Sequence, residues 1–259
     1  LETLREVDFI AAEDTRRTIK LLNYYKIRGS LISYHEHNKE GRGREIIKLL
    51  EEGKKVALVS DAGTPGISDP GYELIKESIN RNIEVISLPG PCAAVAAVTV
   101  SGFSIRKFAL FGFLSSKKKD KKKELEEIRR EKKTIVIYEA PHRLVKTLKS
   151  IIEVTGDREA AVCREMTKKF EEIKRGKLSQ IIPYYEANPP KGEITLVISG
   201  REEEEPQAGK SLSEGVEEVK KLKEGGLREK EAVKKAAGEF NLSPKELYKQ
   251  VIEEKEKTK

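Results

Sequence analysis

A loop rich in glycine and proline is the first segment whose residue types suit ligand binding. Residues 56–71 have the sequence VALVSDAGTPGISDPG, with three glycines and two prolines from Gly63 to Gly71. Glycine lets the backbone approach a ligand closely, and the loop follows an apolar strand at the end where open α/β sheets bind ligands. It lacks the GxxxxGK[ST] and GxGxxG phosphate-binding patterns. We therefore expect a ligand loop of another class, with a purely structural connection as the alternative.

A turn followed by small residues is the second candidate. Residues 85–102 have the sequence VISLPGPCAAVAAVTVSG, in which Pro89-Gly90-Pro91 turns the chain before a helix that begins at Cys92–Ala94. The first N–H groups of a helix have no partner inside it, and small side chains leave them accessible to a polar ligand. A tightly packed internal helix explains the same residues equally well.

Charged or glycine-bearing segments follow several other apolar runs directly. These segments lie within AAEDTRRT (11–18), SYHEHN (33–38), TIVIYEAPHR (134–143), AAVCREMTK (160–168) and PPKGEITLVISG (189–200). Each one alone is explained by capping or by ordinary surface charge. Because they recur at strand after strand, together they predict a shared rim around a cleft.

Helix and strand patterns alternate through the first 200 residues, which predicts an α/β fold. Several predicted strands are continuous apolar runs, as expected for strands covered on both faces. The predicted strands are Phe9–Ala12, Leu31–Tyr34, Lys55–Ser60, Glu84–Leu88, Phe108–Gly112, Thr134–Tyr138, Ala160–Arg164, Phe170–Lys174 and Ile194–Ser199. The predicted helices are Thr15–Tyr25, Arg44–Glu52, Pro70–Asn80, Ala93–Ser101, Lys121–Lys132 and Leu144–Thr155.

These elements divide into two predicted α/β domains. A seam near Ser101–Lys107, between an apolar helix and a new strand, separates an N-terminal domain at 1–104 from a C-terminal domain at 105–201. A linker is predicted at 202–210, where an acidic run precedes proline and glycine.

The remaining residues, 211–259, have a wholly helical pattern. Ser243 suits a helix N-cap and Pro244 the first helical position, so a short turn precedes the last helix. Three short helices with such a turn resemble a helix-turn-helix module. A small helical cap or a dimer element is the alternative.

Positive charge is concentrated in one segment. The net charge of the chain is +7, and residues 117–133, KKKDKKKELEEIRREKK, carry ten basic and five acidic side chains. A concentrated cationic segment favours a polyanionic partner, because each neutralised phosphate releases counterions. A solvated loop and helix face is the alternative.

Composition excludes other classes of protein. No run approaches the roughly 18 uncharged apolar residues of a membrane span, so we expect no membrane partner. Cys92 and Cys163 lie in separate apolar runs, so we expect reduced cysteines and a cytoplasmic location. The three histidines lack the spacing of metal ligands, so we expect no metal. The chain opens at Leu1 with neither an export signal nor a methionine, and we expect the natural start to be missing.

Seven motifs together resemble a known family. In chain order they are AAEDTRRTIKLL, SYHEHN, VSDAGTPGISDPG, LPGPCAAVAAVTVSGF, YEAPHR, REMTKKFEE and KGEITLVISG. Over about residues 4–200 the chain resembles the ribosomal RNA small subunit methyltransferase I family, a subgroup of the tetrapyrrole-methylase-like, class III S-adenosylmethionine methyltransferases. The helical tail resembles the helix-turn-helix extension of that subgroup.

The resemblance implies a fold, a reaction and partners. The fold has two α/β domains of the tetrapyrrole methylase type, with the methyl donor S-adenosylmethionine in the cleft between them and usually a homodimer. The acceptor is the ribose 2′-hydroxyl of a cytidine in the decoding region of 16S ribosomal RNA, either as free RNA or within the small ribosomal subunit.

The resemblance also implies roles for particular residues. Those expected to bind the donor are Asp61, Gly63, Thr64, Ala93, Ala94, Tyr138, Arg164, Glu193, Ile194 and Thr195. The carboxylates expected to include the general base are Glu13, Asp14 and Glu165, with salt bridges within the rim as the alternative. Those expected to hold RNA are Arg16, Arg17, Lys118, Lys119, Lys121, Lys122, Arg143, Lys245 and Lys249.

One departure from the family pattern has a structural consequence. The family begins with a strand and a PTPIGN-like loop ahead of the helix that here starts near Leu1, and this piece is absent from the sequence. We therefore expect the first sheet to lack one strand and the donor site to lack part of its lining. The alternatives to a ribosomal RNA methyltransferase are a non-catalytic RNA-binding assembly factor and a related methylase acting on a corrinoid or a protein side chain.

Overall fold

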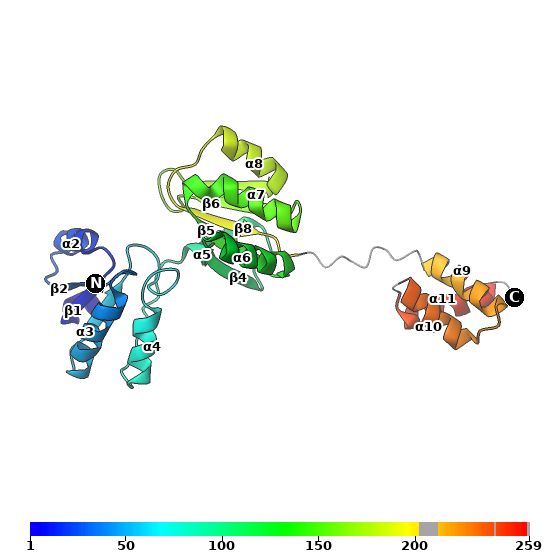
Figure 1. The fold of residues 1–259 in the computed structure, drawn as a ribbon, viewed down its shortest axis with the longest axis horizontal. Helices are drawn as coiled ribbons and strands as arrows, with labels where there is room; N and C mark the ends of the chain where they lie inside the picture. Colours follow the sequence, from blue (N-terminus) through cyan, green and yellow to red (C-terminus); the bar gives the residue numbers. More distant parts are fainter. Residues whose placement is uncertain (202–211, 241, 258–259) are drawn as a thin grey trace. The chain divides into compact units, whose positions relative to one another are not determined.

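The computed structural model forms two compact units, Leu1–Arg201 and Glu202–Lys259 (Figure 1). It describes residues 1–201, 212–240 and 242–257, so the linker predicted at 202–210 lies outside the described residues. The boundary at 104/105 between two α/β domains stays a prediction.

The first unit begins with a parallel sheet of three short strands. In the order β2-β1-β3 they are Ser30–Ser33, Phe9–Ala12 and Val56–Val59. In β1, Ile10 pairs with Leu31 on one side and with Ala57 on the other. The three strands are confirmed to within one residue at each end. Because they are parallel, the segments after Ala12, Ser33 and Val59 all leave the same edge of the sheet.

Helices cover both faces of this sheet. Ile10 packs with Leu22 on one face, whereas Ala11 packs with Ile46 and Leu74 on the other. The alternation follows from the two-residue period of a strand. The helices of this part are α1 (Glu2–Glu6), α2 (Thr15–Tyr24), α3 (Lys39–Glu51) and α4 (Tyr72–Asn80).

The strand predicted at Glu84–Leu88 does not form, and that prediction is wrong. Residues 83–92 belong to no helix or strand of the structure. Val85, Ile86 and Leu88 are exposed by 45%, 73% and 60%. A strand is defined by backbone hydrogen bonds to a neighbour, and no strand in the described part of the chain pairs with this apolar segment.

The second sheet of the unit is mixed. In the order β4-β5-β8-β6-β7, its strands are Phe108–Phe113, Thr134–Glu139, Ile194–Ile198, Glu159–Arg164 and Glu172–Lys177. The β4–β5 pair is parallel and the other three pairs are antiparallel. Every residue of β8 is buried, as its continuous apolar sequence predicts. The strand predicted at Phe170–Lys174 starts two residues later, at Glu172.

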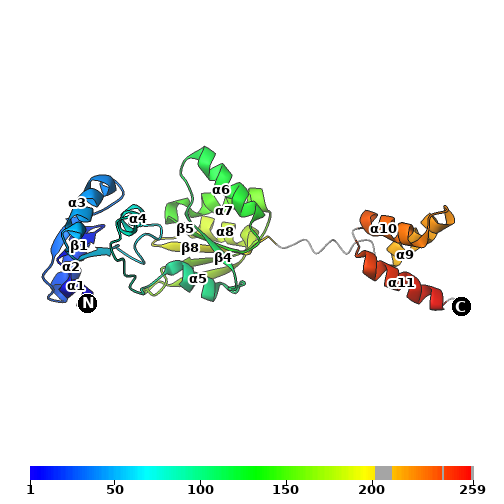
Figure 2. The ribbon, with the colours of Figure 1, turned by 90° about the horizontal axis from the view of Figure 1, so that it is seen from below.

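The two faces of the second sheet are covered differently, as Figure 2 shows. Helix α5 (Ala93–Ser101) packs its alanines against Val136, Ala161 and Val197 on one face. The other face supports α6 (Lys118–Arg130), α7 (Leu144–Thr155) and α8 (Leu178–Ala187). Although α5 was predicted within the N-terminal domain, its packing surface is therefore the second sheet.

Helix α8 was not predicted from the sequence. Pro183 lies inside it, and proline removes an intrahelical hydrogen bond and disfavours a helix interior. Its buried residues Leu178, Ile181 and Tyr185 are spaced three and four apart, which is the helical period. The tertiary contact of this apolar face with the sheet outweighs the local cost of the proline.

The second unit consists of three helices around a small core. They are α9 (Leu212–Glu224), α10 (Glu229–Glu239) and α11 (Pro244–Lys257). Val219, Ala236 and Leu247 represent the three helices in that core. A Cβ on Gly215 would lie 2.5 Å from Leu242 Cδ1, so a larger residue there would have to displace the Leu242 side chain. The likeness to a helix-turn-helix module stays a prediction.

Two kinds of feature are absent from the ranges given above. No described helix combines the length and the apolar character that crossing a bilayer requires. No group of three or more His, Cys, Asp or Glu residues among the described side chains is arranged to hold a metal ion.

Candidate functional site

The carboxyl edge of the first sheet brings Glu13 and Asp61 together. Glu13 follows β1 and Asp61 follows β3, and the Asp61 backbone N–H donates to Glu13 Oε2 over 3.3 Å. Arg17, in the first turn of α2, forms an ion pair with Asp61 at 3.1 Å. The predicted base Glu13, the predicted donor ligand Asp61 and the predicted RNA ligand Arg17 therefore lie in one cluster.

Asp14 and Arg16, also predicted at this edge, pair with each other. The Asp14 side chain caps α2 by accepting from the Arg16 N–H at 2.9 Å, and its other oxygen pairs with the guanidinium. The hydrogen bonds from Arg16 lower the pKa of Asp14 to about 2. A carboxylate with so low a pKa is a weak base at neutral pH, so this geometry disfavours Asp14 as the general base.

The glycine-rich loop between β3 and α4 reaches residues outside its own sheet. Thr64 Oγ1 donates to the Pro91 carbonyl over 3.2 Å. The neighbouring Gly63 has φ +74°, and a Cβ placed on it would lie 3.9 Å from the same carbonyl oxygen. A Cβ on Gly112 of β4 would lie 2.9 Å from Ser68 Oγ. The loop therefore contacts both the turn before α5 and the edge strand of the second sheet.

The start of α5 is joined to the second sheet by Tyr138. The Ala94 N–H donates to the Tyr138 hydroxyl over 3.3 Å, and no side chain caps this helix at Cys92. The Tyr138 and Phe113 rings lie 5.7 Å apart. Burial is the largest cause that raises the pKa of Tyr138. The predicted donor ligands Ala94 and Tyr138 are thus in direct contact, with Ala93 adjacent as the first residue of the helix.

The remaining predicted donor ligands lie on two different faces of the second sheet. Thr195 pairs with Tyr138 in the β5–β8 ladder, so both side chains face α5. Arg164 pairs with Ile194 in the β6–β8 ladder, and these two face the helices α6 to α8. Glu193, just before β8, is exposed. The structure therefore gathers only Tyr138 and Thr195 on the face that α5 covers.

Arg164 is held by side chains of its own face. Its guanidinium forms an ion pair with Glu172 at 3.0 Å, and the other oxygen of Glu172 accepts hydrogen bonds from Tyr184 and Tyr185 of α8. The hydrogen bond to Glu172 raises the pKa of Tyr184, and the negative charge of Glu172 adds to the rise. This arrangement fixes β7 and α8 on the sheet and favours a structural role for Arg164.

Glu165 is held between two loops of the second sheet. Its carboxylate accepts from the Glu193 N–H at 2.9 Å and pairs with Lys168 Nζ at 2.9 Å, and its own N–H donates to the Glu193 carbonyl. The Glu193 N–H and Lys168 both lower the pKa of Glu165. A base whose pKa is lowered by two such partners is a weaker candidate than Glu13.

Gly192 should be irreplaceable beside this carboxylate. Its φ is +87°, and a Cβ on it would lie 2.3 Å from Glu165 Cδ. We expect Gly192→Ala to lower the free energy of unfolding by roughly 1–3 kcal/mol, because it combines strain with displacement of Glu165. Calorimetry measures this, with Gly41→Ala as control, since no atom lies within 4 Å of a Cβ there. Equal melting temperatures for Gly192→Ala and wild type would contradict the prediction.

A buried carboxylate organises the end of β5. Glu139 is 2% exposed, accepts from Thr147 Oγ1 at 2.5 Å and from the Ala140 N–H at 2.8 Å, and pairs with Arg143 at 3.2 Å. Lys121 Nζ donates to the same Thr147 hydroxyl, and burial lowers the pKa of Lys121. Lys121 and Arg143, both predicted RNA ligands, are thus tied into the fold.

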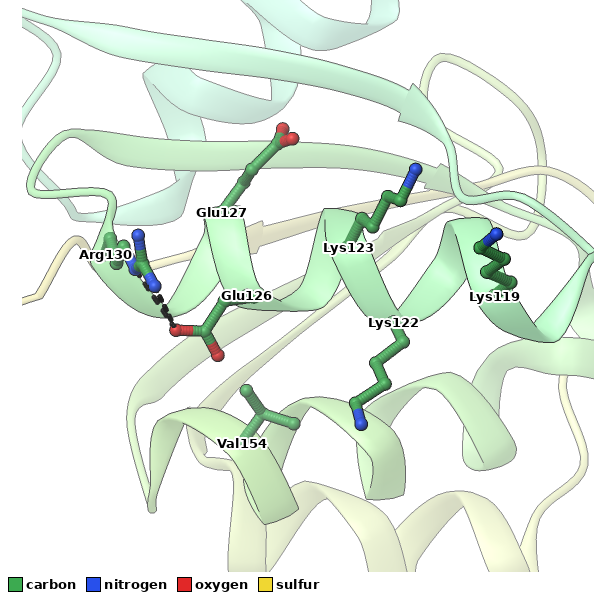
Figure 3. A pocket seen from close by; sticks show the side chains of 7 residues that line it. All are labelled: Lys119, Lys122, Lys123, Glu126, Glu127, Arg130 and Val154. Carbon is green, nitrogen blue, oxygen red and sulfur yellow. Dashed lines mark hydrogen bonds and ion pairs between the residues drawn. The ribbon is translucent and has the colours of Figure 1, made fainter.

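Of the other predicted lysines of α6, Lys119 and Lys122 line a groove of about 610 Å³ between α6 and α7, together with Lys123, which was not predicted. Figure 3 shows Lys122 and Glu126 on the side of α6 that faces Val154 of α7, with Lys123 pointing away from it. Lys119 and Lys122 make no ion pair with described residues, whereas Arg130 pairs with Glu126 at 3.0 Å. This surface, Lys119, Lys122 and Lys123 with exposed Lys118 beside it, is called the α6 lysine surface below.

Lys245 and Lys249 belong to the second unit. Both are exposed on α11, and Lys249 lies 3.8 Å from Glu253 one turn later. An exposed i,i+4 ion pair of this kind contributes little to stability, so an anionic partner can easily replace Glu253 beside Lys249. Their role in RNA binding stays a prediction.

Asp69 is a titratable residue of the glycine-rich loop that the sequence did not single out, although it lies within the quoted motif GISDPG. Burial raises its pKa to about 6, and the negative charge of Glu13 adds to the rise. Its own charge in turn contributes to the raised pKa of Tyr138. Asp69 therefore lies within electrostatic reach of residues from both sheets. The signal in the sequence was an acidic residue flanked by Ser68 and Pro70 inside a glycine-rich loop.

Known proteins resemble this chain over most of its length. It is 47% identical over 251 residues to the ribosomal RNA small subunit methyltransferase I of Bacillus subtilis (strain 168), covering 96% of this chain and 86% of that protein. It is 52% identical over 202 residues to the protein of the same name from Thermotoga maritima, covering 78% of this chain and 90% of that one.

A solved structure shares the fold. The uroporphyrin-III C-methyl transferase from Thermus thermophilus, complexed with S-adenosyl homocysteine, has a TM-score of 0.53 at 15% identity, covering 76% of this chain and 87% of that one. Residues 1–182 match the family model described as Tetrapyrrole (Corrin/Porphyrin) Methylases. These findings confirm the predicted fold class and the predicted family. The chain therefore belongs to the tetrapyrrole methylase family of methyltransferases and, within it, to the ribosomal RNA small subunit methyltransferase I proteins.

Proposed function

We propose that this chain transfers the methyl group of S-adenosylmethionine to the ribose 2′-hydroxyl of a cytidine in 16S ribosomal RNA. The observation that carries the proposal is the pair of hydrogen bonds from Thr64 to Pro91 and from Ala94 to Tyr138. They join the glycine-rich loop, the uncapped start of α5 and the second sheet, which are the segments expected to hold the donor. The names of the curated relatives support a ribosomal RNA acceptor.

The chemistry of these residues fits the donor. S-adenosylmethionine supplies a methyl group activated on a sulfonium cation, and it also carries an ammonium, a carboxylate and ribose hydroxyls. Asp61 and Glu13 offer carboxylate oxygens to cationic and hydroxyl groups. The N–H groups at the start of α5, at Ala93 and beyond, suit a carboxylate because no side chain caps them. Gly63 leaves the backbone of the loop open to close approach.

The protein's task in this reaction is alignment and proton removal. A hydroxyl is a poor nucleophile, so holding it in line with the methyl carbon supplies several kcal/mol of the barrier. A general base that accepts the hydroxyl proton contributes a further 10²–10⁴-fold or thereabouts. Of the predicted bases, Glu13 has the geometry for this, because Asp14 and Glu165 are committed to internal partners.

The α6 lysine surface is proposed to bind the RNA backbone. Phosphate contacts position an RNA, and a nucleotide splayed out of its stack can then enter the reaction site. Lys119 and Lys122 have no ion-pair partner among described residues, so contact with phosphate breaks no internal salt bridge. The assembly into a homodimer and the cytoplasmic location also stay proposals.

Three measurements on the full chain test this function. Calorimetric titration with S-adenosylmethionine should show binding. Tritiated methyl should then transfer to small-subunit RNA or to the small ribosomal particle. The product should resist alkaline cleavage at one cytidine, because a 2′-O-methyl group blocks attack by that oxygen. RNA binding without donor affinity would support an assembly factor, and transfer to a corrinoid or protein but not to RNA would support the other enzymatic alternative.

Tyr138 provides a graded test of the donor site. We expect Tyr138→Phe to weaken donor binding roughly 3- to 10-fold, which corresponds to losing one hydrogen bond at about 0.5–1.5 kcal/mol. The reason is that the Ala94 N–H loses its acceptor and the start of α5 is held less firmly. Calorimetry measures the affinity, with Tyr24→Phe as the matched control because Tyr24 is 79% exposed. Unaltered affinity in Tyr138→Phe would show that this contact does not shape the site.

A further inference from the structure

The motif REMTKKFEE contributes a loop to the edge of the second sheet at which β5 ends. The last residues of β5 and β6 both pair with Ile194, the first residue of β8, which lies between them. The loop after β6, residues 165–171, therefore leaves the sheet beside the end of β5. Its Met166 packs against the hydrophobic cluster between α5 and the sheet, and the candidate donor ligand Tyr138 packs against the same cluster. Direct packing thus holds this loop beside the candidate donor site.

Hydrogen bonds fix the backbone of the loop. The Glu171 N–H donates to the Lys168 carbonyl over 3.2 Å, so Lys169 and Phe170 are the two central residues of a tight turn. The Glu171 carboxylate accepts from the Thr167 N–H at 2.6 Å. Thr167 has φ +66°, a costly conformation for a β-branched residue that persists only where the surrounding structure enforces it. Lys169 and Phe170 are therefore presented at the tip of a firmly held loop.

This tip combines an exposed aromatic ring with positive charge. Phe170 is 63% exposed. Lys169 Nζ lies 5.6 Å from the centre of the Phe170 ring, and Lys169 makes no ion pair with described residues. Lys191, which is also exposed and has no ion pair within the described ranges, lies in the loop before β8. That loop is tied to this one, because the Glu165 carboxylate accepts from the Glu193 N–H.

We infer that Phe170 is a stacking platform for a base of the RNA, with Lys169 and Lys191 contacting the phosphates beside that base. Proteins bind single-stranded nucleic acids with this combination, in which bases stack on aromatic rings and cations follow the backbone. A nucleotide splayed out of the RNA loses its stacking on neighbouring bases, and an aromatic ring restores part of that energy. The inference rests on the proposed function and deepens it, because it names a residue that positions the acceptor strand.

A protein partner is the other class of molecule that an exposed phenylalanine suits. Lysine is depleted at the centres of protein–protein interfaces, whereas it is enriched where nucleic acid phosphates bind. The ring of Phe170 has one lysine directly over it and a second in the adjoining loop. RNA is therefore the occupant that this charge favours.

A direct test uses the absence of tryptophan from the sequence. In the full chain, Phe170→Trp introduces a single tryptophan at the tip of the loop. We expect its fluorescence to fall when small-subunit RNA is added, because a base stacked on the indole quenches its emission. The matched control is Tyr24→Trp, since Tyr24 is 79% exposed and ends α2, which begins at the carboxyl edge of the first sheet and runs away from it. Its fluorescence should stay unchanged when the same RNA is added.

The affinity for small-subunit RNA separates stacking from simple apolar contact. Phe170→Ala should lower this affinity roughly 5-fold or more at ~0.1 M salt, which is the loss expected for one stacked base. Phe170→Tyr keeps an aromatic ring and should stay within about twofold of wild type, whereas Phe170→Leu keeps apolar area but no ring and should resemble Phe170→Ala. Donor affinity and melting temperature should match wild type in all three, because Phe170 is largely exposed.

The contrary results are distinct. Phe170→Ala or Phe170→Leu with wild-type RNA affinity, or Phe170→Trp emission that RNA leaves unchanged, overturns the inference, while methyl transfer to RNA by the wild type keeps the proposed function standing. Weaker methylation of the small ribosomal particle by Phe170→Ala, with unchanged affinity for naked RNA, overturns it in favour of a protein partner. A wild type that methylates no RNA removes the proposed function, and quenching of Phe170→Trp by RNA in that case still supports the stacking contact.

Discussion

Replacing Glu139 with alanine is expected to lower the free energy of unfolding of the Leu1–Arg201 unit by about 3 kcal/mol, since it breaks a largely buried ion pair. The side chain of Glu139 is fully buried, whereas that of Arg143 is 28% exposed, which places the effect at the lower end of such pairs. The Thr147 hydroxyl and the Ala140 N–H lose their acceptor in the same step. Because each kcal/mol shifts a domain of this size by about 2–4 °C, calorimetry of the full chain should show a drop of roughly 6–12 °C.

The matched control is Glu186→Ala. Glu186 also pairs with a cation, Lys149 at 2.6 Å, but the two side chains are 45% and 53% exposed. An exposed pair contributes about 0–1 kcal/mol, so this variant should melt within a few degrees of wild type. Glu139→Gln should fall between the two, because its amide oxygen still accepts from Thr147. If Glu139→Ala melts like Glu186→Ala, the Glu139 network does not support the fold.

Elements whose signal is local could be predicted from the sequence. The expected strand forms at 9–12, in the run FIAA, and the expected helix forms at 93–101, in the run AAVAAVTVS. In both, the hydrophobic pattern that indicates the element lies within the segment itself. The segment at 84–88 has the same apolar character but forms no strand, since strand formation depends on a neighbour elsewhere in the chain. Helix α8 shows the reverse, where packing overrides Pro183.

The candidate site shows the same division. The glycine-rich loop and the turn before α5 were visible as clusters of special residues, and the structure brings them into contact through Thr64 and Pro91. The sequence did not predict which charged residues would lack an ion-pair partner. Arg164 is neutralised by Glu172 on the next strand. The raised pKa of Asp69 comes first from burial and then from the charge of Glu13, more than fifty positions away in the chain. Such pairings depend on topology, which periodicity does not encode.

Neutralising the α6 lysine surface is expected to weaken RNA binding about 100-fold at ~0.1 M salt. The variant changes Lys119, Lys122 and Lys123 to glutamine, which preserves helix propensity. Each phosphate contact on single-stranded RNA contributes about 0.7 to the slope of log affinity against log salt, so three contacts contribute about 2. Near 1 M salt these contacts add nothing to RNA affinity. When the salt concentration is lowered tenfold to ~0.1 M, a slope of about 2 raises the RNA affinity about 100-fold.

The matched control removes three lysines at a distance from that groove. Lys20, Lys26 and Lys54 are exposed around the first sheet and make no ion pair with described residues, so their change to glutamine alters net charge equally. A long-range effect of net charge would weaken RNA binding in both variants alike, whereas local phosphate contact weakens it only in the α6 variant. Donor affinity should be unchanged in both, because neither set includes Asp61, Ala94 or Tyr138. A salt slope that is the same in all three proteins would place the RNA on another surface.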